Sequence, residues 1–294
     1  MRLDWLDDIL AVLDTGSFAR AAEARHLTQS AFTRRIRAIE DSIGAELFDR
    51  NRKPVALLPT VRAQEPEMRA LAAGLRRLRD TLRRSGTGGA GAISLACQHA
   101  ITTTVSPRLV ALLTAQGGHS VRVRSGNRDE CLLKLLAGEV DFAVMYALPG
   151  EPALPEERGF DAVTLGADTF LPVAAPGITG GAGDWPLIAY PADVFLGQIM
   201  DRAILPRVPE QIRFARRAET ALTLAACEYA LAGIGIAWLP RSMVAGALTD
   251  GRLVALDDQL PDQKLDIRMI RLAGASAPAL DTAWARLSEG WRGV

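Results

Sequence analysis

The chain has 294 residues, of which 49% are hydrophobic and 23% are charged, a composition that excludes a disordered or unusually polar protein. This length predicts about two domains and allows a substantial core. The 34 Lys and Arg residues equal the 34 Asp and Glu residues in number, so net charge alone argues against nucleic-acid binding. The charge is unevenly spread, however. Residues 1–90 hold 16 basic against 12 acidic side chains, a net of +4, which leaves 18 against 22, a net of −4, for the remainder.

Nothing in the sequence predicts export or a membrane span. Three of the first eight residues are aspartates, where a secretory signal would be basic and then apolar. The longest apolar stretch, residues 221–240, is interrupted by Glu228 and by a Gly-Ile-Gly break, which favours a buried helix followed by a strand. Three cysteines fit a reducing compartment better than a disulfide framework. We therefore expect a cytoplasmic protein with no membrane partner.

Two short helical patterns meet at a tight junction within residues 17–48. Ser17 and Thr28 stand where N-cap residues are expected, and each can accept a hydrogen bond from an unpaired backbone N–H. The inner face of the second helix is predicted to consist of Ala31, Phe32, Ile36 and Ile39. Its outer face is predicted to consist of Gln29, Ser30, Thr33, Arg34 and Arg37. Amides, hydroxyls and guanidiniums pair with base edges and phosphates, so the pattern favours a DNA-binding helix-turn-helix over an ordinary solvated helix face.

Residues 3–53 resemble the winged helix-turn-helix of LysR-type transcriptional regulators. The matching positions are Leu10, Gly16-Ser17-Phe18, Ala21-Ala22, 27–36, Ile39-Glu40, Gly44 and 47–50. The resemblance implies that Arg50, Arg52 and Lys53 lie on the wing and hold phosphates or reach the minor groove. One segment departs from the family, because Leu57-Leu58-Pro59-Thr60-Val61 replaces the usual Leu-Thr-x-x-Gly. Pro59 and the missing glycine leave the start of the next helix open.

Residues 64–84 are expected to form one long helix. Five apolar side chains step along it by 3, 4, 3 and 4: Met68, Leu71, Leu75, Leu78 and Leu82. This spacing is typical of a coiled-coil seam, and a second recognition helix is needed to contact two half-sites, so we expect this helix to pair with a second copy. An amphipathic helix packed on its own domain is the alternative. The glycine-rich residues 85–91 then predict a flexible hinge.

Beyond the hinge, short apolar strands alternate with helical patterns. Strands are expected at 92–97, 121–123, 141–145, 171–174, 187–190 and 234–240, and helices at 105–113, 131–136, 218–231 and 280–287. The β-α-β-α-β order predicts a mainly parallel sheet with helices on both faces. Residues 138–143 and 233–240 also resemble two signatures of the LysR effector domain, which implies a two-lobed periplasmic-binding-protein-like fold with a ligand cleft between the lobes.

The predicted architecture is therefore α/β with three parts. A winged helix-turn-helix DNA-binding domain occupies residues 1–60, and a linker or dimerisation helix with its hinge occupies 61–91. The effector-binding domain occupies 92–294, with lobe I formed by 92–164 and 266–294 and lobe II by 165–265.

A polar segment follows the first strand of the effector domain, where ligands of open α/β sheets tend to bind. By family resemblance it lines the effector pocket, and it leads into a helix N-terminus, which favours anions. Its candidate effector-binding residues are Gln98, His99, Thr102 and Thr103. Ordinary helix capping is the alternative for the threonines. Phe195, Glu219 and Thr220 are expected at corresponding places in the second lobe.

Within the family, several segments resemble the HypT-like, hypochlorite-responsive branch. They are Asp4-Trp5-Leu6, 31–38, 235–240 and 249–253. This resemblance implies the hypothesis of oxidant sensing. Cys97 is the leading candidate, because a nearby imidazolium of His99 or a helix N-terminus would lower the pKa of its thiol. Weaker candidates are Cys131, Cys227, Met145, Met200 and Met243. For each of these sulfur residues, an ordinary place in the core is the stronger explanation.

An enzyme is the main alternative class. The three histidines have no ligand partner at helical spacing, and neither CxxC nor HExxH occurs, so no metal site and no cofactor are expected. A small-molecule-binding protein of the two-lobed fold would explain the lobes but not the helix-turn-helix. The sequence therefore predicts a regulator without enzyme activity. Its expected partners are double-stranded DNA, a small-molecule effector or oxidant, a second copy in a dimer or tetramer, and RNA polymerase.

Overall fold

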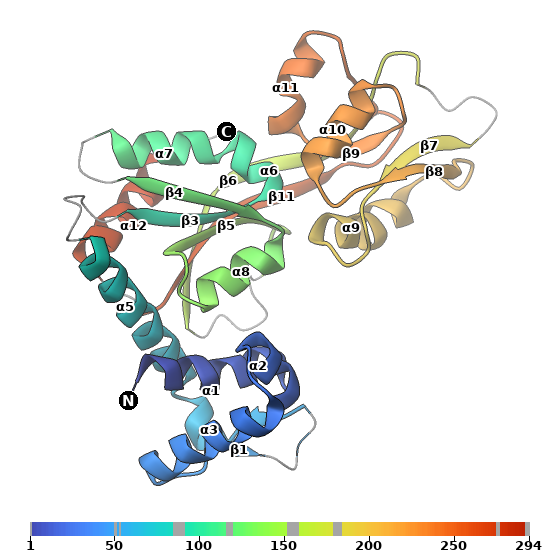
Figure 1. Cartoon of the computed structure of the whole chain (residues 1–294). Coiled ribbons are helices and arrows are strands. Elements are labelled where there is room, and N and C mark those ends of the chain that lie inside the picture. Colours follow the sequence, from blue (N-terminus) through green and yellow to red (C-terminus); the bar gives the residue numbers. More distant parts are fainter. Residues whose placement is uncertain are drawn as a thin grey trace.

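The computed structural model describes residues 2–49, 52, 54–84, 92–115, 120–151, 159–178, 184–274 and 277–291. A small helical unit at one end of the molecule is joined by a long helix to a larger α/β part (Figure 1). Within the described ranges, no helix is both long and apolar enough to cross a membrane.

The N-terminal unit consists of three helices and a two-stranded wing. The helices are α1 (Leu3–Thr15), α2 (Phe18–Ala24) and α3 (Gln29–Ile43), and the wing strands are β1 (Phe48–Asp49) and β2 (Ala56–Leu57), which pair antiparallel. The helices enclose a compact apolar core in which Phe32 and Ile36 are completely buried. The predicted helix-turn-helix fold is thus confirmed, and the two wing strands follow α3 in the chain.

The two predicted N-caps differ. Thr28 caps α3 as expected, because its Oγ1 accepts a hydrogen bond from the Ala31 backbone N–H at 3.3 Å. Ser17 occupies the N-cap position of α2, but its side chain makes no capping hydrogen bond, so that prediction is wrong. The carbonyl oxygen of Ser17 is engaged instead, accepting from the Thr15 hydroxyl at 3.1 Å.

Pro59 starts a short helix and does not disrupt the chain. It lies in the first turn of α4 (Pro59–Arg62), where a backbone N–H would have no partner within the helix. Just before it, the Leu58 N–H donates to the Leu47 carbonyl at 2.9 Å, which ties this segment to the wing. The long helix α5 (Glu65–Arg84) follows, one residue later than the predicted start.

The α/β part is built on a seven-stranded sheet in the order β10-β6-β11-β5-β3-β4, with β9 paired to β6. The strands are β3 (Ile93–Gln98), β4 (Val121–Gly126), β5 (Phe142–Ala147), β6 (Phe160–Ala174), β9 (Ala237–Pro240), β10 (Val254–Ala255) and β11 (Gln263–Leu272). Strand β3 runs parallel to β4 and β5, whereas β6, β9, β10 and β11 pair antiparallel. The prediction of a mainly parallel sheet is correct for β3, β4 and β5, the strands of its β-α-β-α-β pattern, whereas the sheet as a whole is mixed. Strand β11 lies between β5 and β6 and pairs antiparallel with both.

Helices cover both faces of the sheet, as predicted (Figure 1). On one face lie α6 (His99–Thr104), α7 (Ser106–Thr114) and α12 (Pro278–Gly290), and on the other lies α8 (Arg128–Leu136). Successive residues of β5 point to opposite faces of the sheet. Val144 therefore packs in the apolar cluster on the side of α6, α7 and α12, and Met145 packs in the cluster on the side of α8. Burial of β5 on both sides explains its uninterrupted apolar sequence.

The second lobe contains a parallel pair of strands, β7 (Trp185–Ala189) and β8 (Phe214–Glu219). Its helices are α9 (Phe195–Ile199), the π-helix η1 (Met200–Ile204), the 3-10 helix η2 (Leu205–Arg207), α10 (Thr223–Leu231) and α11 (Arg241–Thr249). The predicted helix at 218–231 is wrong at its start. Ala218 and Glu219 belong to β8, where they pair with Ile188 and Ala189.

Strands β6 and β11 run through both lobes. They pair antiparallel from Gln263–Phe170 to Leu272–Phe160, and the pairing shifts between Ile267 and Arg268, so that Leu165 is an extra residue in β6. Both proposed lobe boundaries, 164/165 and 265/266, fall inside these strands. The lobes are therefore joined by continuous strands.

Candidate DNA interface and effector site

The outer face of α3 presents the predicted polar side chains. Gln29, Ser30, Arg34 and Arg37 are exposed, while Phe32, Ile36 and Ile39 on the opposite face are at most 1% exposed. Two of the predicted residues depart from this pattern. Thr33 is half-buried and its hydroxyl donates to the Gln29 carbonyl at 2.9 Å, and Ala31, expected in the core, is only half-buried.

Arg35 lies in the same helix but faces inward. Its Nη2 is 2.7 Å from Oδ2 of Asp8, a residue with 0% exposure, and 3.6 Å from Oδ2 of Asp4. Arg25, which follows α2, donates from Nε to the other Asp8 oxygen at 2.8 Å. The acidic start of the chain therefore pairs with arginines inside the unit. Asp4 and Asp8 lie one helical turn apart, so the sequence places both carboxylates on one side of α1 but does not identify the arginines that pair with them.

A close backbone approach holds the wing against the helices. Gly16 adopts a left-handed conformation with φ of +61°, and a Cβ atom there would lie 2.8 Å from Cβ of Pro54. The Val55 N–H donates to the Gly16 carbonyl at 3.0 Å. Of the three predicted wing cations, Arg52 is exposed, and Arg50 and Lys53 lie outside the described residues.

Helix α5 has one exposed apolar stripe. Leu71, Leu75 and Leu78 are 52%, 40% and 54% exposed. Met68, which the sequence placed in the same seam, is instead 8% exposed and packs into the core of the N-terminal unit. The side chain of Leu82 and the predicted hinge at 85–91 lie outside the described residues.

Two of the four predicted effector residues in lobe I converge on Ser125, at the end of β4. Nδ1 of His99 is 2.9 Å from the Ser125 Oγ, and the Thr102 hydroxyl donates to the same oxygen at 3.0 Å. Gln98 is 5% exposed, and its Oε1 accepts from the Tyr146 backbone N–H at 3.0 Å. Thr103 is exposed and donates to the Ala100 carbonyl at 3.0 Å, a bond within α6 that is neither a bond to the other candidates nor helix capping.

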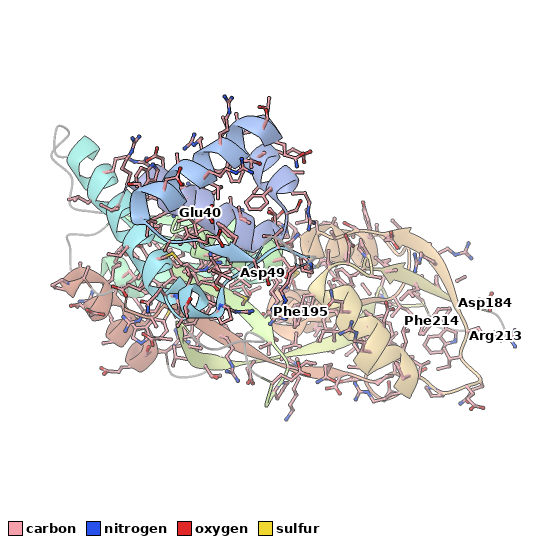
Figure 2. The ribbon with its side chains drawn as sticks, turned by 90° about the horizontal axis from the view of Figure 1, so that it is seen from below. Glu40, Asp49, Asp184, Phe195, Arg213 and Phe214 are labelled. Carbon is pink, nitrogen blue, oxygen red and sulfur yellow. The ribbon has the colours of Figure 1, made fainter. Side chains whose placement is uncertain are left out.

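Phe195 is the predicted lobe II residue that touches lobe I. The guanidinium of Arg128, in the first turn of α8, lies 4.5 Å from the centre of the Phe195 ring. Figure 2 labels Phe195 near the middle of the molecule, far from Asp184, Arg213 and Phe214 at the tip of lobe II. Burial lowers the pKa of Arg128, an effect opposed by the charges of Asp129 and Glu151.

The other two lobe II candidates make local bonds. Glu219 is exposed and pairs with Arg216 of the same strand. The Thr220 hydroxyl accepts from the Leu222 N–H at 3.1 Å in the turn that leads into α10.

A buried carboxylate between the lobes was missed from the sequence. Asp168 of β6 is 6% exposed, and its Oδ2 accepts from the Tyr146 hydroxyl at 2.9 Å and from the Ser242 hydroxyl at 2.5 Å. Its Oδ1 accepts from the backbone N–H groups of Thr169 and Ser242 at 2.8 and 3.2 Å. Asp168 and Ser242 lie far apart in the chain, so no local pattern marks them as partners. Burial and the charge of Asp168 raise the pKa of Tyr146 above its usual range.

The predicted lowering of the Cys97 pKa is wrong. Cys97 is fully buried, and burial, with a smaller contribution from Cys131, raises its thiol pKa to about 12. Burial likewise raises the pKa of Cys131 to about 12 and that of Cys227 above its usual value. The imidazole of His99, which was predicted to lower the pKa of Cys97, is hydrogen-bonded to Ser125.

The methionine candidates differ in exposure. Met145 is completely buried and Met200 is 4% exposed, whereas Met243 at the start of α11 is half-buried. Across the described ranges, no group of three or more His, Cys, Asp and Glu side chains is arranged to hold a metal ion.

Two family models match this chain. The model described as "Bacterial regulatory helix-turn-helix protein, lysR family" covers residues 3–64, and that described as "LysR substrate binding domain" covers residues 86–292. The chain therefore belongs to the LysR family of DNA-binding transcriptional regulators, with an N-terminal helix-turn-helix and a two-lobed effector-binding domain. The family match confirms the prediction of a regulator instead of an enzyme.

Several relatives match over nearly their whole length. The HTH-type transcriptional regulator YjiE of Escherichia coli K12 is 26% identical over 291 residues, which is 97% of this chain and 93% of that protein. The full-length structure of HypT from Salmonella typhimurium, a hypochlorite-specific LysR-type regulator, is 26% identical, covers 99% of both chains and has a TM-score of 0.61. Vibrio fischeri DarR in complex with DNA shares the fold, with 24% identity, 98% coverage of both chains and a TM-score of 0.60.

Proposed function

We propose that this regulator binds its target DNA as a dimer or tetramer through α3 and the wing, and that a small molecule or oxidant acting between the two lobes changes this binding. The observation that carries the proposal is the division of α3 into two faces. Phe32 and Ile36 are fully buried, while Gln29, Ser30, Arg34 and Arg37 project outward. Base contacts are assigned to Gln29, Ser30, Thr33 and Arg34, and phosphate contacts to Arg37 and the wing residues Arg50, Arg52 and Lys53.

Arg34→Ala tests the assignment of α3. Footprinting on the DNA upstream of the protein's own gene would first define a protected site, and fluorescence anisotropy would then compare that site with unrelated DNA of the same length. Loss of a base contact should weaken binding to the protected site by about 1–3 kcal/mol while binding to unrelated DNA changes little. Arg217→Ala is the matched control, because Arg217 is an exposed arginine in β8 of lobe II. Equal loss on both DNAs would make Arg34 a phosphate contact, and no loss would contradict its role.

The exposed stripe of α5 supports self-association. Leu71, Leu75 and Leu78 project from one side of the helix, and exposed apolar side chains at coiled-coil spacing favour pairing with a like helix. The double substitution Leu71→Gln and Leu75→Gln should raise the dimer dissociation constant by about tenfold or more in sedimentation equilibrium. Val254→Gln, which changes an exposed apolar residue of β10, is the control. An unchanged association state would contradict the seam.

The region between the lobes supports an effector site. His99, Thr102 and Ser125 form a hydrogen-bonded group at the end of β4, and Phe195 contacts Arg128 across the lobes. An effector or oxidant that prefers one arrangement of the lobes would shift the dimers and so change DNA bending and contact with RNA polymerase.

The resemblance to HypT supports the oxidant version and a place in the HypT-like branch. Among the sulfur candidates, Met243 is more exposed than the three buried cysteines, Met145 and Met200. A footprint that changes in length or bending after mild oxidation would support this version. A footprint that ignores the oxidant would favour a small-molecule effector, and Met243→Leu would separate Met243 from other sites of oxidation.

A further inference from the structure

A chain of ion pairs connects the linker helix α5 to the recognition helix α3. It runs through Arg76, Asp7, Arg25, Asp8 and Arg35, and is called here the α1 ion-pair chain because both carboxylates belong to α1. We propose that these five residues are positioning residues, which set the orientation of α3 according to the position of α5 and of the effector domain behind it. The inference rests on the proposed function of α3 in DNA contact and deepens it.

Each link of the α1 ion-pair chain joins α1 to another part of the fold. Arg76 of α5 pairs with Oδ1 of Asp7, and Oδ2 of Asp7 is 3.8 Å from Nη2 of Arg25, the residue that ends α2. Nε of Arg25 donates to Oδ1 of Asp8 at 2.8 Å, and Oδ2 of Asp8 is 2.7 Å from Nη2 of Arg35 in α3. The sequence of contacts therefore runs from α5 through α1 and α2 to α3.

The two carboxylates and Arg76 are largely shielded from water. Asp8 has 0% exposure, and the side chains of Asp7 and Arg76 are 17% and 16% exposed, whereas those of Arg25 and Arg35 are 31% and 40% exposed. Electrostatic attraction is stronger where water is excluded, and a buried carboxylate that loses a cationic partner is strongly disfavoured. Asp7 and Asp8 each pair with two arginines, so a displacement of one arginine weakens its ion pair and is opposed by the attraction of that carboxylate. Because the same carboxylate also holds a second arginine, the displacement affects both.

The effector domain touches the same arginine. Gly138, in the turn after α8, has a φ of +65°, and a Cβ atom there would lie 2.7 Å from Cα of Ala73 and 3.0 Å from Nη1 of Arg76. Ala73 shares an apolar cluster with Cys131 and Leu135 of α8. The α8 side of lobe I thus packs directly on α5 beside Arg76, on the side of the molecule where the N-terminal unit lies (Figure 1).

The contact at Arg76 is incompletely satisfied. Its Nη1 is buried and, among the described residues, has no hydrogen-bond partner. A buried donor without a partner disfavours the arrangement that creates it, so a shift of α8 that brings an acceptor or water to Nη1 changes the free energy of this contact. Motion of lobe I relative to α5 would in this way reach Asp7 and then α3.

A second ion pair between α1 and α5 provides a matched control. Nη2 of Arg69 is 2.7 Å from Oδ1 of Asp14 and 2.9 Å from Oε1 of Glu65. These carboxylates belong to α1 and α5, so this pair attaches the same two helices without passing to α2 or α3. Asp7→Asn and Asp14→Asn each remove one negative charge and one α1–α5 ion pair. They differ in whether the broken pair continues to α3.

The experiment measures binding of the full-length protein to its footprinted site and to unrelated DNA of equal length. We expect Asp7→Asn to lower the ratio of the two affinities by about three- to tenfold, while Asp14→Asn leaves it within about twofold. Arg76→Gln breaks the same link from the other helix and should match Asp7→Asn, which covers the case in which Asp7→Asn fails to fold. Equal effects of Asp7→Asn and Asp14→Asn would reduce the chain to simple attachment of α5 and overturn the proposal.

A double-mutant cycle tests transmission directly. Arg76→Gln and Arg35→Lys alter residues at opposite ends of the chain, so independent sites would give multiplicative losses in affinity. Losses that depart from the product by more than about twofold would support the chain, and a simple product would overturn it. Unaltered site preference in every variant would overturn only the ion-pair chain. A wild-type protein with no preference for any DNA would overturn the proposed function and this inference together.

Discussion

The outer face of α3 and the polar group between the lobes are built in opposite ways. On α3, Gln29, Ser30, Arg34 and Arg37 extend into solvent from a helix whose other side is anchored in a core. Between the lobes, Gln98, Thr102 and Asp168 are engaged with other residues of the chain. A DNA-contact surface can be ready before its ligand arrives because its side chains already project into solvent, with few hydrogen bonds to the rest of the chain to give up. An effector must exchange existing hydrogen bonds for its own, and this exchange couples binding to a change in the protein.

The largest expected effect tests how inaccessible the buried thiol of Cys97 is. Because burial raises the pKa of Cys97 from 9.0 to about 12, its thiolate fraction at pH 8 should be about a thousandfold smaller in the native than in the unfolded protein. Alkylation of Cys97 by iodoacetamide, followed by mass spectrometry, should be slower in the native state by at least this factor. If Cys97 is alkylated as fast in the native protein as in the unfolded protein, its thiol is accessible, and Cys97 is again a candidate oxidant sensor.

The same shift sets a pH dependence of stability. The folded state favours the neutral thiol. The contribution of this preference to the free energy of unfolding is fully present below pH 9.0 and is lost as the pH rises towards about 12. The free energy of unfolding should fall over this range by up to about 1.4 kcal/mol per pH unit for each of Cys97 and Cys131. Cys97→Ala should flatten the slope.

The next effect concerns the buried carboxylate. Asp168→Ala would leave the hydroxyls of Tyr146 and Ser242 and two backbone N–H groups without their acceptor. We expect a loss of about 3 kcal/mol in the free energy of unfolding, measured by urea denaturation. Tyr146→Phe removes one of these bonds and should cost about 1 kcal/mol. If Asp168→Ala lowers the free energy of unfolding by less than about 1 kcal/mol, Asp168 does not hold Tyr146 and Ser242 together.

The smallest effect separates the two N-caps of the DNA-binding unit. Thr28→Ala removes a capping bond of 3.3 Å and should destabilise the protein by about 1 kcal/mol. Ser17→Ala should have a much smaller effect, because no capping bond is present. Thermal unfolding of the two variants side by side measures the difference. Equal losses would show that Ser17 also acts as a cap in solution.

The outer face of α3 could be predicted from the sequence more fully than the polar group between the lobes, for a physical reason. The faces of α3 follow from a repeat of three and four residues, so Phe32, Ile36 and Arg34 could be placed from their neighbours alone. The bonds of Arg35 to Asp8 and of Asp168 to Ser242 join residues that come together only when helices and strands pack. Pro59 illustrates the same limit, since its effect depended on whether it fell within a helix or at its start.

The continuity of β6 and β11 has a mechanical consequence. Two paired strands that pass through both lobes resist sliding of one lobe against the other, so any change in the angle between the lobes has to bend these strands. The ladder of hydrogen bonds is interrupted at the extra residue Leu165, where the pairing of the strands shifts, so bending there would disturb the fewest of these bonds. Gly166 beside it leaves room for Trp291, whose Nε1 would be only 3.0 Å from a Cβ atom at that position. Trp291 thus packs at the place where the pairing of the two strands shifts, and its ring limits how far the strands can bend there.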